Sequence, residues 1–268
     1  ANNSVRVTDQ FMEAVLNNEN WELKARTTGE VIKVIKAEDL FKQLAQASWE
    51  CADPGIQFDT TINRWHTTPV SGRINGSNPC SEYVHLDNSA CNLSSLNLLN
   101  FLNDDNEFDV DGFRHAVRIM ITAQEILVSP SDYPTETIGD NARKYRQLGL
   151  GYTNLGALLM ALGLAYDSDD ARSLAAVITA IMTGEAYKTS SQIAARLGSF
   201  EGYDLNKEAM LSVLNAHREA IAKIPVNEAV PPALRAAAVE VWGNVIRFAE
   251  QSGVRNSQVS VLAPTGTI

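Results

Sequence analysis

The chain contains 268 residues, enough to bury the core of one large domain or two small ones. Apolar residues make up 45% and charged residues 20%, which is ordinary globular usage and excludes general disorder and fibrous repeats. The formal net charge of −10 argues against a nucleic-acid polymer or an anionic membrane as the main partner, although local donors can still hold a small phosphorylated ligand.

The cysteines are Cys51, Cys80 and Cys91, an odd and sparse set without the CxxC spacing of a zinc site. They predict no disulfide scaffold, and we expect a reducing, cytoplasmic setting. The first residues resemble no signal peptide, and apolar runs such as 155–164 are too short to span a bilayer. We therefore expect an internal piece of a longer protein that does not enter a membrane.

The amino-terminal part mixes helical and extended patterns. Thr8 can cap a short helix with one apolar side, and residues 31–35 are β-branched and predict a strand. A second helix is expected from Asp39 to the Asp-Pro-Gly break at 53–55. Cys51 falls on the apolar face of that helix, and we predict that it is a core residue.

The next part is less regular. Residues 55–63 predict a strand, residues 64–79 a long loop rich in Thr, Ser, Pro, Gly and Asn, and residues 80–86 a further strand. The acidic run 104–111 lacks the closing glutamate of a calcium loop, since Arg118 stands there, and we expect a solvated turn and no metal site.

Residues 147–152 predict a buried strand and residues 154–162 the helix after it. Gly149 and Gly151 suggest a dinucleotide-binding turn, but the third glycine of that motif is Asn154. We expect the two glycines to serve a close packing turn between strand and helix.

Helical periodicity, proline near the start and glycine after the end define the longer helices, which cover residues 168–197, 206–223 and 231–252. His217 shares a face with apolar residues and is expected in the core. Residues 257–262 alternate and predict a last strand. Strands that alternate with long helices indicate an α/β architecture.

Segment 77–83 carries the most informative chemistry. In an extended chain, Asn78, Cys80 and Glu82 would project from one face. An amide can hold a hydroxyl, a carboxylate can accept a proton, and a thiol can act as a nucleophile or, after one-electron oxidation, remove a hydrogen atom. Spacing alone does not choose between these roles.

Two further segments add to this pattern. Cys91 follows eleven residues after Cys80, and a second thiol nearby is what a redox step requires. At the end of the sequence, residues 264–268 form a Pro-Thr-Gly-Thr-Ile turn after a strand, which exposes backbone N–H groups and hydroxyls to a phosphate.

Together these motifs resemble the catalytic subunit of ribonucleotide reductase, most closely its adenosylcobalamin-dependent class II branch. The resemblance covers essentially the whole chain. It is carried by Asn-Pro-Cys-Ser-Glu-Tyr at 78–83, Ala-Cys-Asn-Leu-Ser-Ser-Leu-Asn-Leu at 90–98, Leu-Gly-Leu-Gly at 148–151, Arg-Asn-Ser at 255–257 and Leu-Ala-Pro-Thr-Gly-Thr-Ile at 262–268.

The resemblance implies a radical reaction at the ribose. Cys80 would carry the thiyl radical that removes the 3′ hydrogen, and Glu82 would accept the proton of the 3′ hydroxyl. Asn78 would bind the substrate hydroxyls. Cys91 would be one member of the dithiol that becomes a disulfide while the 2′ hydroxyl leaves as water.

Substrate and partners follow from the same resemblance. It implies ribonucleoside diphosphates as substrates, adenosylcobalamin as cofactor, a thioredoxin-like reductant and a homodimer. Pro79 and Ser81 would line the sugar pocket. The substrate phosphates would be held by Pro264, Thr265, Gly266, Thr267 and Ile268.

The family's catalytic domain is a ten-stranded α/β barrel with the radical cysteine on an interior loop, so residues 1–268 are expected to form part of such a barrel, with helical insertions. Residues 64–82 are long enough for that loop, and a thiyl radical requires a dry, enclosed site. The family's partner of Cys91 lies upstream of the matched region, and the sequence ends inside the phosphate motif. The barrel is therefore expected to be incomplete.

Two other interpretations remain open at this point. A thiol hydrolase could use Cys80 with His85 as its base, although on a strand these residues would face opposite sides. Alternatively, the isolated chain is a catalytically silent scaffold that offers only part of a site.

Overall fold

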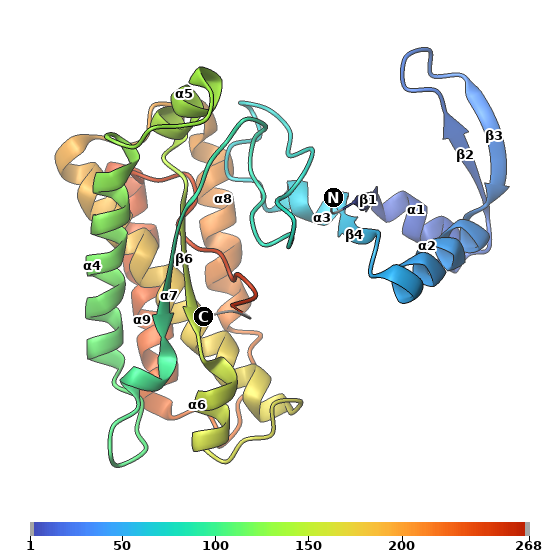
Figure 1. Cartoon of the computed structure of the whole chain (residues 1–268). Helices are drawn as coiled ribbons and strands as arrows, with labels where there is room; N and C mark the ends of the chain where they lie inside the picture. The colour runs from blue at the N-terminus through green and yellow to red at the C-terminus, as the bar shows by residue number, and fades with distance from the viewer. Residues whose placement is uncertain (1–2, 266–268) are drawn as a thin grey trace. The chain divides into compact units, whose positions relative to one another are not determined.

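The computed structural model describes residues 3–265, which fall into two compact units divided between Trp65 and His66. Figure 1 labels the elements of each unit. The amino-terminal unit contains β1 (Ser4–Val7), α1 (Asp9–Leu16), β2 (Asn20–Lys24), β3 (Val31–Lys36), α2 (Ala37–Cys51), β4 (Gly55–Phe58) and α3 (Asp59–Arg64).

The amino-terminal unit has a small core between its two longer helices. β1 pairs in parallel with β4, and β2 and β3 form an antiparallel hairpin. Phe11 of α1 is buried and meets the Trp21 ring edge-on at 5.2 Å between centroids. As the sequence predicts, the Thr8 hydroxyl caps α1 by accepting from the Phe11 N–H at 3.2 Å.

Two predictions for this unit are wrong. Cys51 is exposed at the last turn of α2, because the core of the unit is too small to cover the end of that helix. The expected strand over 55–63 ends at Phe58, where the chain turns into α3.

The carboxy-terminal unit combines a small parallel sheet with long helices. Its elements are β5 (Asn92–Asn97), the 3₁₀ turn η1 (Leu98–Phe101), α4 (Val110–Val128), α5 (Glu136–Tyr145), β6 (Leu148–Thr153), α6 (Leu155–Ala161), α7 (Asp169–Leu197), α8 (Tyr203–Ile221) and α9 (Pro232–Ser252). The predicted strand at 147–152 and the helices after it are confirmed to within three residues, whereas the strand expected at 257–262 is reduced to a single bridge at Ser260.

The sheet places three segments side by side. β5 and β6 are parallel, with Leu93 opposite Gly149, and a parallel bridge from Leu150 to Ser260 adds segment 258–261 beside β6. Long helical crossovers connect these segments, as parallel neighbours require. Residues 3–265 thus form a mixed α/β structure without a closed barrel, and they do not confirm ten strands.

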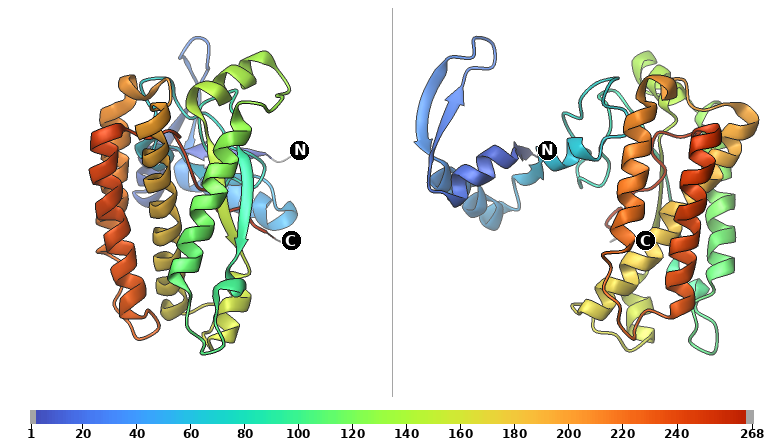
Figure 2. Two further views of the ribbon diagram at one scale, coloured as in Figure 1. Left: turned by 90° about the vertical axis from the view of Figure 1, so that its left-hand side faces the viewer. Right: turned by 180° about the vertical axis from the view of Figure 1, so that it is seen from behind.

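The helices cover one face of this sheet. α7 packs along α9, and α4 and α8 flank the pair, as Figures 1 and 2 show from three sides. Leu148 and Leu150 of β6 enter the core against these helices and are fully buried. Gly184 of α7 allows the close approach of α9, since a Cβ there would lie 2.7 Å from the Val241 side chain.

A buried carboxylate ties the sheet to the helices. The Glu125 side chain of α4 accepts from Arg146 at 2.7 Å, from Arg255 at 2.8 Å and from the Asn256 amide at 2.6 Å. Asn256 is buried and also bonds Ser190 of α7. The network therefore fixes the start of β6 and the approach to segment 258–261.

No helix within residues 3–265 is long and apolar enough to cross a membrane.

We predict that Glu125→Gln lowers the free energy of unfolding by about 3–5 kcal/mol, because it leaves the buried Arg146 guanidinium without its counter-charge. Urea unfolding of the purified chain measures this loss. Glu208→Gln, an exposed change on α8, is the control and should alter the free energy by less than about 0.5 kcal/mol. Equal effects of the two changes would contradict the prediction.

His217 of α8 is half-buried and stacks on Trp242 at 5.2 Å between ring centroids, so it packs against the core and does not lie inside it. Burial lowers the pKa of His217 from 6.5 to about 4. Between these values the unfolded chain binds a proton that the folded chain does not, so stability falls as the pH falls from 6.5 to 4. His217→Phe should remove up to about 1.4 kcal/mol per pH unit of that slope in urea titrations. Parallel curves for the two proteins would disprove this.

Candidate active site

The segment that carries Cys80 is a closed turn. The Tyr83 N–H donates to the Asn78 side-chain oxygen at 3.1 Å, and the Ser77 hydroxyl donates to the Tyr83 carbonyl at 2.7 Å. The Ser81 N–H donates to the Asn78 carbonyl at 3.0 Å, and Ser81 has a φ of 63°. Residues 80–86 are therefore not the expected strand.

This turn changes the expected convergence of side chains. Pro79, Cys80 and Ser81 lie exposed at its tip, whereas Glu82 points inward and is half-buried. Asn78 uses its side-chain oxygen to close the turn. The prediction that Asn78, Cys80 and Glu82 share one face of an extended chain is wrong, because the backbone reverses between the first and the last of them.

Glu82 and Cys91 lie together beneath the turn. One Glu82 carboxylate oxygen is buried and has no hydrogen-bond partner among residues 3–265. Burial, and secondly the charge of Glu82, raise the pKa of the Cys91 thiol from 9.0 to about 12. Cys91 is therefore a protonated thiol at neutral pH. The negative charge of Glu82 acts on this thiol and helps to keep it protonated.

The sulfur of Cys91 borders a groove on the face of the sheet that the helices leave open. A Cβ at Gly149 would lie 2.5 Å from the Cys91 sulfur, and a Cβ at Gly151 would collide with the Val261 carbonyl. The groove has a volume of about 550 Å³. It is lined by Leu93, Ser94, Ser95, Asn97, Gly149, Thr153, Asn154, Val261 and Ala263.

These glycines do not form the expected packing turn between strand and helix. Leu148 and Leu150 point to the core, whereas Gly149 and Gly151 face the other side, where their missing side chains leave space for the Cys91 sulfur, the Leu93 and Val261 side chains and the Val261 carbonyl. Sequence reasoning missed Ser95, Asn97 and Asn154 as groove residues. The signal that could have found them is the alternation of leucine and glycine in β6. It marks a strand whose leucines face the core and whose opposite face carries no side chains of its own at the glycine positions.

The phosphate-binding residues expected after segment 258–261 are described only in part. Pro264 is exposed, and Thr265 is half-buried with a φ of 54°. Gly266, Thr267 and Ile268 lie outside the described residues. Pro264 follows Ala263, which lines the groove, so the expected phosphate segment begins at the edge of the cavity.

The geometry does not support a pairing of Cys80 with His85. His85 is buried, with its ring nitrogens 3.1 Å from the Gln147 amide and 3.0 Å from the Ser257 hydroxyl, while Cys80 is exposed. Burial, and secondly the charge of His66, lower the pKa of His85 from 6.5 to about 3. A base for thiol hydrolysis would have to face the sulfur and accept a proton near neutral pH.

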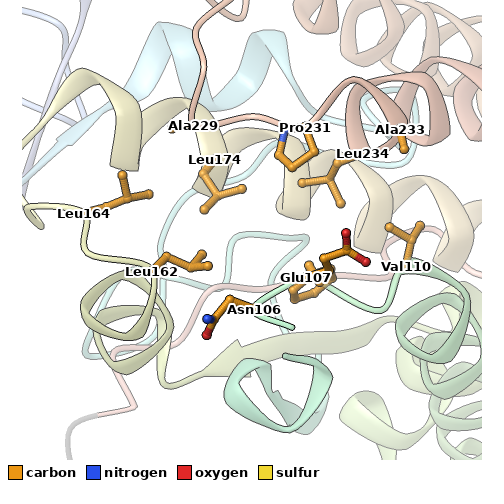
Figure 3. A pocket seen from close by; sticks show the side chains of 11 residues that line it. Asn106, Glu107, Val110, Leu162, Leu164, Leu174, Ala229, Pro231, Ala233 and Leu234 are labelled. Atoms are coloured by element: carbon orange, nitrogen blue, oxygen red, sulfur yellow. The ribbon is translucent and has the colours of Figure 1, made fainter. Parts of the chain in front are cut away.

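A separate apolar cavity of about 340 Å³ lies between the 103–109 loop, the end of α6 and the start of α9. Figure 3 shows Leu162, Leu174 and Leu234 around it, with the Glu107 carboxylate at one side. It contains no cysteine. Within residues 3–265, no group of His, Cys, Asp and Glu side chains could hold a metal ion. The groove of the sheet is therefore the candidate site, because the Cys91 sulfur lies beside Gly149 of its lining.

Comparison with known proteins identifies the family of the chain. The family model described as the ribonucleotide reductase barrel domain matches residues 1–268. A vitamin B12-dependent ribonucleotide reductase of Streptomyces coelicolor is 53% identical over the whole chain, and the chain covers 28% of that protein. The corresponding protein of Rhodopirellula baltica is 50% identical, with 26% covered.

A vitamin B12-dependent ribonucleoside-diphosphate reductase of Mycobacterium tuberculosis is 32% identical over the whole chain, and the chain covers 33% of it. The chain thus spans about a quarter to a third of the length of these relatives. The order of the motifs, the turn that carries Cys80 and the match over all residues lead to one conclusion: the chain belongs to the ribonucleotide reductase barrel-domain family.

Proposed function

We propose that this chain forms part of the catalytic barrel of a cobalamin-dependent ribonucleotide reductase, which reduces ribonucleotides to 2′-deoxyribonucleotides for DNA synthesis. The supporting observation is the pair beneath the loop, a protonated Cys91 thiol and a Glu82 carboxylate with one unbonded buried oxygen. The pair combines a source of electrons and protons with a proton acceptor, and the Cys91 sulfur lies beside Gly149, which lines the groove.

Cys80 carries the radical step in this proposal. A thiyl radical on Cys80 takes the hydrogen atom from the ribose 3′ carbon, so the sulfur becomes a thiol and the radical moves to the sugar. After reduction, the same thiol returns the hydrogen atom to the 3′ carbon. A fixed turn suits this role, because the sulfur has to return to the same carbon atom.

Glu82 accepts the proton of the 3′ hydroxyl while the radical is on the sugar. Its buried oxygen, which has no partner within residues 3–265, can receive that proton without first losing a hydrogen bond. Asn78 holds a substrate hydroxyl through its amide nitrogen, which donates to no described residue. Pro79 and Ser81 line the sugar pocket beside Cys80.

Cys91 supplies reducing equivalents. The 2′ hydroxyl leaves as water, Cys91 and a second cysteine outside this chain give up two electrons and two protons, and a disulfide forms between them. A thiol with a pKa near 12 keeps its proton until the step requires it. We propose that a thioredoxin-like protein reduces the disulfide again.

The groove is proposed to hold the nucleotide, with the phosphates at Pro264, Thr265, Gly266, Thr267 and Ile268. Its volume of about 550 Å³ lies within the usual range of ligand pockets. The Mycobacterium tuberculosis relative is a ribonucleoside-diphosphate reductase by name, which supports ribonucleoside diphosphates as the substrates. We further propose that the full-length protein is a cytoplasmic homodimer.

The Streptomyces coelicolor and Rhodopirellula baltica relatives are named as vitamin B12-dependent, which supports adenosylcobalamin as the cofactor. When bound, it would supply the one-electron oxidation that turns a thiol into a thiyl radical. The residues present fit this group, because the Cys80 thiol is exposed at the tip of its turn and a bulky cofactor can approach it. Pro79 and Ser81 flank the sulfur on the same exposed tip.

Residues 1–268 are proposed to supply part of a ten-stranded barrel, whose remaining strands would come from the rest of the full-length protein. Dry surroundings for a radical require a cover over Cys80, and Cys80 is exposed here. The purified chain alone is therefore expected to be silent in a nucleotide-reduction assay, as the alternative of a catalytically silent scaffold states.

In the full-length enzyme, Cys80→Ser should abolish deoxynucleotide formation while nucleotide binding, measured by isothermal titration calorimetry, is retained. Glu82→Gln should lower kcat by about 10²–10⁴-fold, because the proton acceptor is lost. Cys51→Ser changes an exposed thiol of the amino-terminal unit and serves as the control. Deoxynucleotide formation by the Cys80→Ser enzyme would refute the proposed function.

Iodoacetamide should label the exposed Cys51 and Cys80 of the purified chain well before Cys91, because only thiolates react and the raised pKa keeps Cys91 protonated. Glu82→Gln removes the nearby charge, lowers the pKa of Cys91 and should speed its labelling. Peptide mass spectrometry follows each cysteine, with Glu107→Gln as the control. Cys91 labelling that is unchanged by Glu82→Gln would contradict the proposed pair.

A further inference from the structure

His85 is a buried histidine that the proposed reaction does not use. It lies five residues after Cys80 and is only 5% exposed. The Gln147 amide nitrogen is 3.1 Å from its Nδ1, and the Ser257 hydroxyl is 3.0 Å from its Nε2. A side chain with both ring nitrogens engaged holds neighbouring segments together.

The hydrogen-bond partners of His85 indicate which of its ring nitrogens carries the proton. An amide nitrogen can only donate, so Nδ1 of His85 accepts from Gln147, and the ring proton is on Nε2. Nε2 then donates to the Ser257 hydroxyl. Burial, and secondly the charge of His66, lower the pKa of His85 to about 3, which keeps this neutral form across the physiological range.

Both partners stand next to strands of the groove. Gln147 immediately precedes β6, and Ser257 immediately precedes segment 258–261. His85 therefore connects the end of the Cys80 loop to two neighbouring segments of the sheet. Those segments contribute Gly149 and Val261 to the groove.

The beginning of the same loop reaches Ser257 as well. The Thr67 hydroxyl donates to the Ser257 carbonyl at 2.8 Å. The His66 ring lies edge-on to the His85 ring, 5.9 Å between centroids, and the Tyr83 ring stacks on His85 at 6.4 Å. Both ends of the loop over residues 66–86 are thus bonded to Ser257, the residue just before segment 258–261.

We infer that His85 is a positioning residue: through Gln147 and Ser257 it fixes the Cys80 turn relative to the sheet, so that Cys80 and Glu82 reach the ribose. This inference rests on the proposed function. The turn is closed by its own hydrogen bonds between Ser77 and Tyr83, so the ends of the loop decide where the sulfur lies.

The inference separates kcat from KM. The groove is lined by β5, β6 and segment 258–261, and His85 is not among its lining residues. Loss of His85 should therefore misplace the Cys80 turn and lower kcat, with a smaller effect on KM through Asn78, which belongs to the same turn. A displacement of about 1 Å at a reacting group can cost about 10²-fold in rate.

The test compares variants of the full-length enzyme. His85→Leu should lower kcat by about 10–100-fold with a much smaller change in KM, and it should speed hydrogen exchange of the backbone amides of residues 77–83. His85→Gln, which keeps one donor and one acceptor, should recover part of kcat. His217→Leu is the matched control, since it removes another histidine with a burial-lowered pKa, on α8, and should leave kcat unchanged.

Ser257→Ala removes the hydroxyl at little change in volume and should lower kcat in the same direction, so the test holds even where His85→Leu does not fold. An unchanged kcat in Ser257→Ala and in any folded His85→Leu enzyme would overturn the inference. An equal loss in His217→Leu would do so too, because the effect would then be one of general stability. Activity in Cys80→Ser would instead refute the proposed function, and the exchange of residues 77–83 would still report whether His85 anchors the loop.

Discussion

The alternation of β6 is the constraint on which the site depends. Leu148 and Leu150 are drawn into the helical core because burial of apolar side chains is the main driving force of folding. Gly149 and Gly151 must then face the other side, where they leave room for the Cys91 sulfur and the Val261 carbonyl. The same burial that stabilises the carboxy-terminal unit therefore leaves glycine positions on the other face of β6, and the Cys91 sulfur and Val261 approach the backbone there.

Hydrogen bonds around segment 256–257 join this sheet to both the helices and the loop. Asn256 contacts the Glu125 carboxylate and Ser190, and Ser257 contacts Thr67 and His85. The helical core and the Cys80 turn are thus tied to two consecutive residues. An arrangement that left one of these buried polar groups without a hydrogen bond would be less stable. The network therefore favours a single arrangement of the loop on the sheet.

The sequence predicted the parts of the fold that local signals control. The Thr8 cap of α1, the proline before α9 and the glycines that follow α7 and α9 lie where expected, because capping involves only near neighbours. The 80–86 segment is not the predicted strand, because local hydrogen bonds between residues 77 and 83 close it into a turn. The bond of His85 to Ser257, 172 residues away, cannot be seen in the sequence. Likewise, the sequence predicts Cys91 as a redox residue, whereas its position beside Gly149 requires the register of β5 and β6.

The two halves of the proposed chemistry have different physical requirements, and this chain meets one of them. Proton and electron transfer at Glu82 and Cys91 depend on short-range contacts and burial beneath the loop, which residues 82–91 and β6 already provide. Protection of a thiyl radical depends instead on the exclusion of water around Cys80, which is exposed at the tip of the turn. The exposed turn is closed by its own hydrogen bonds between residues 77 and 83, so its backbone arrangement is formed before any cover arrives. In the proposed function this chain would position Cys80, Glu82 and Cys91, and the rest of the full-length protein would supply the second cysteine of the dithiol and the cover that excludes water.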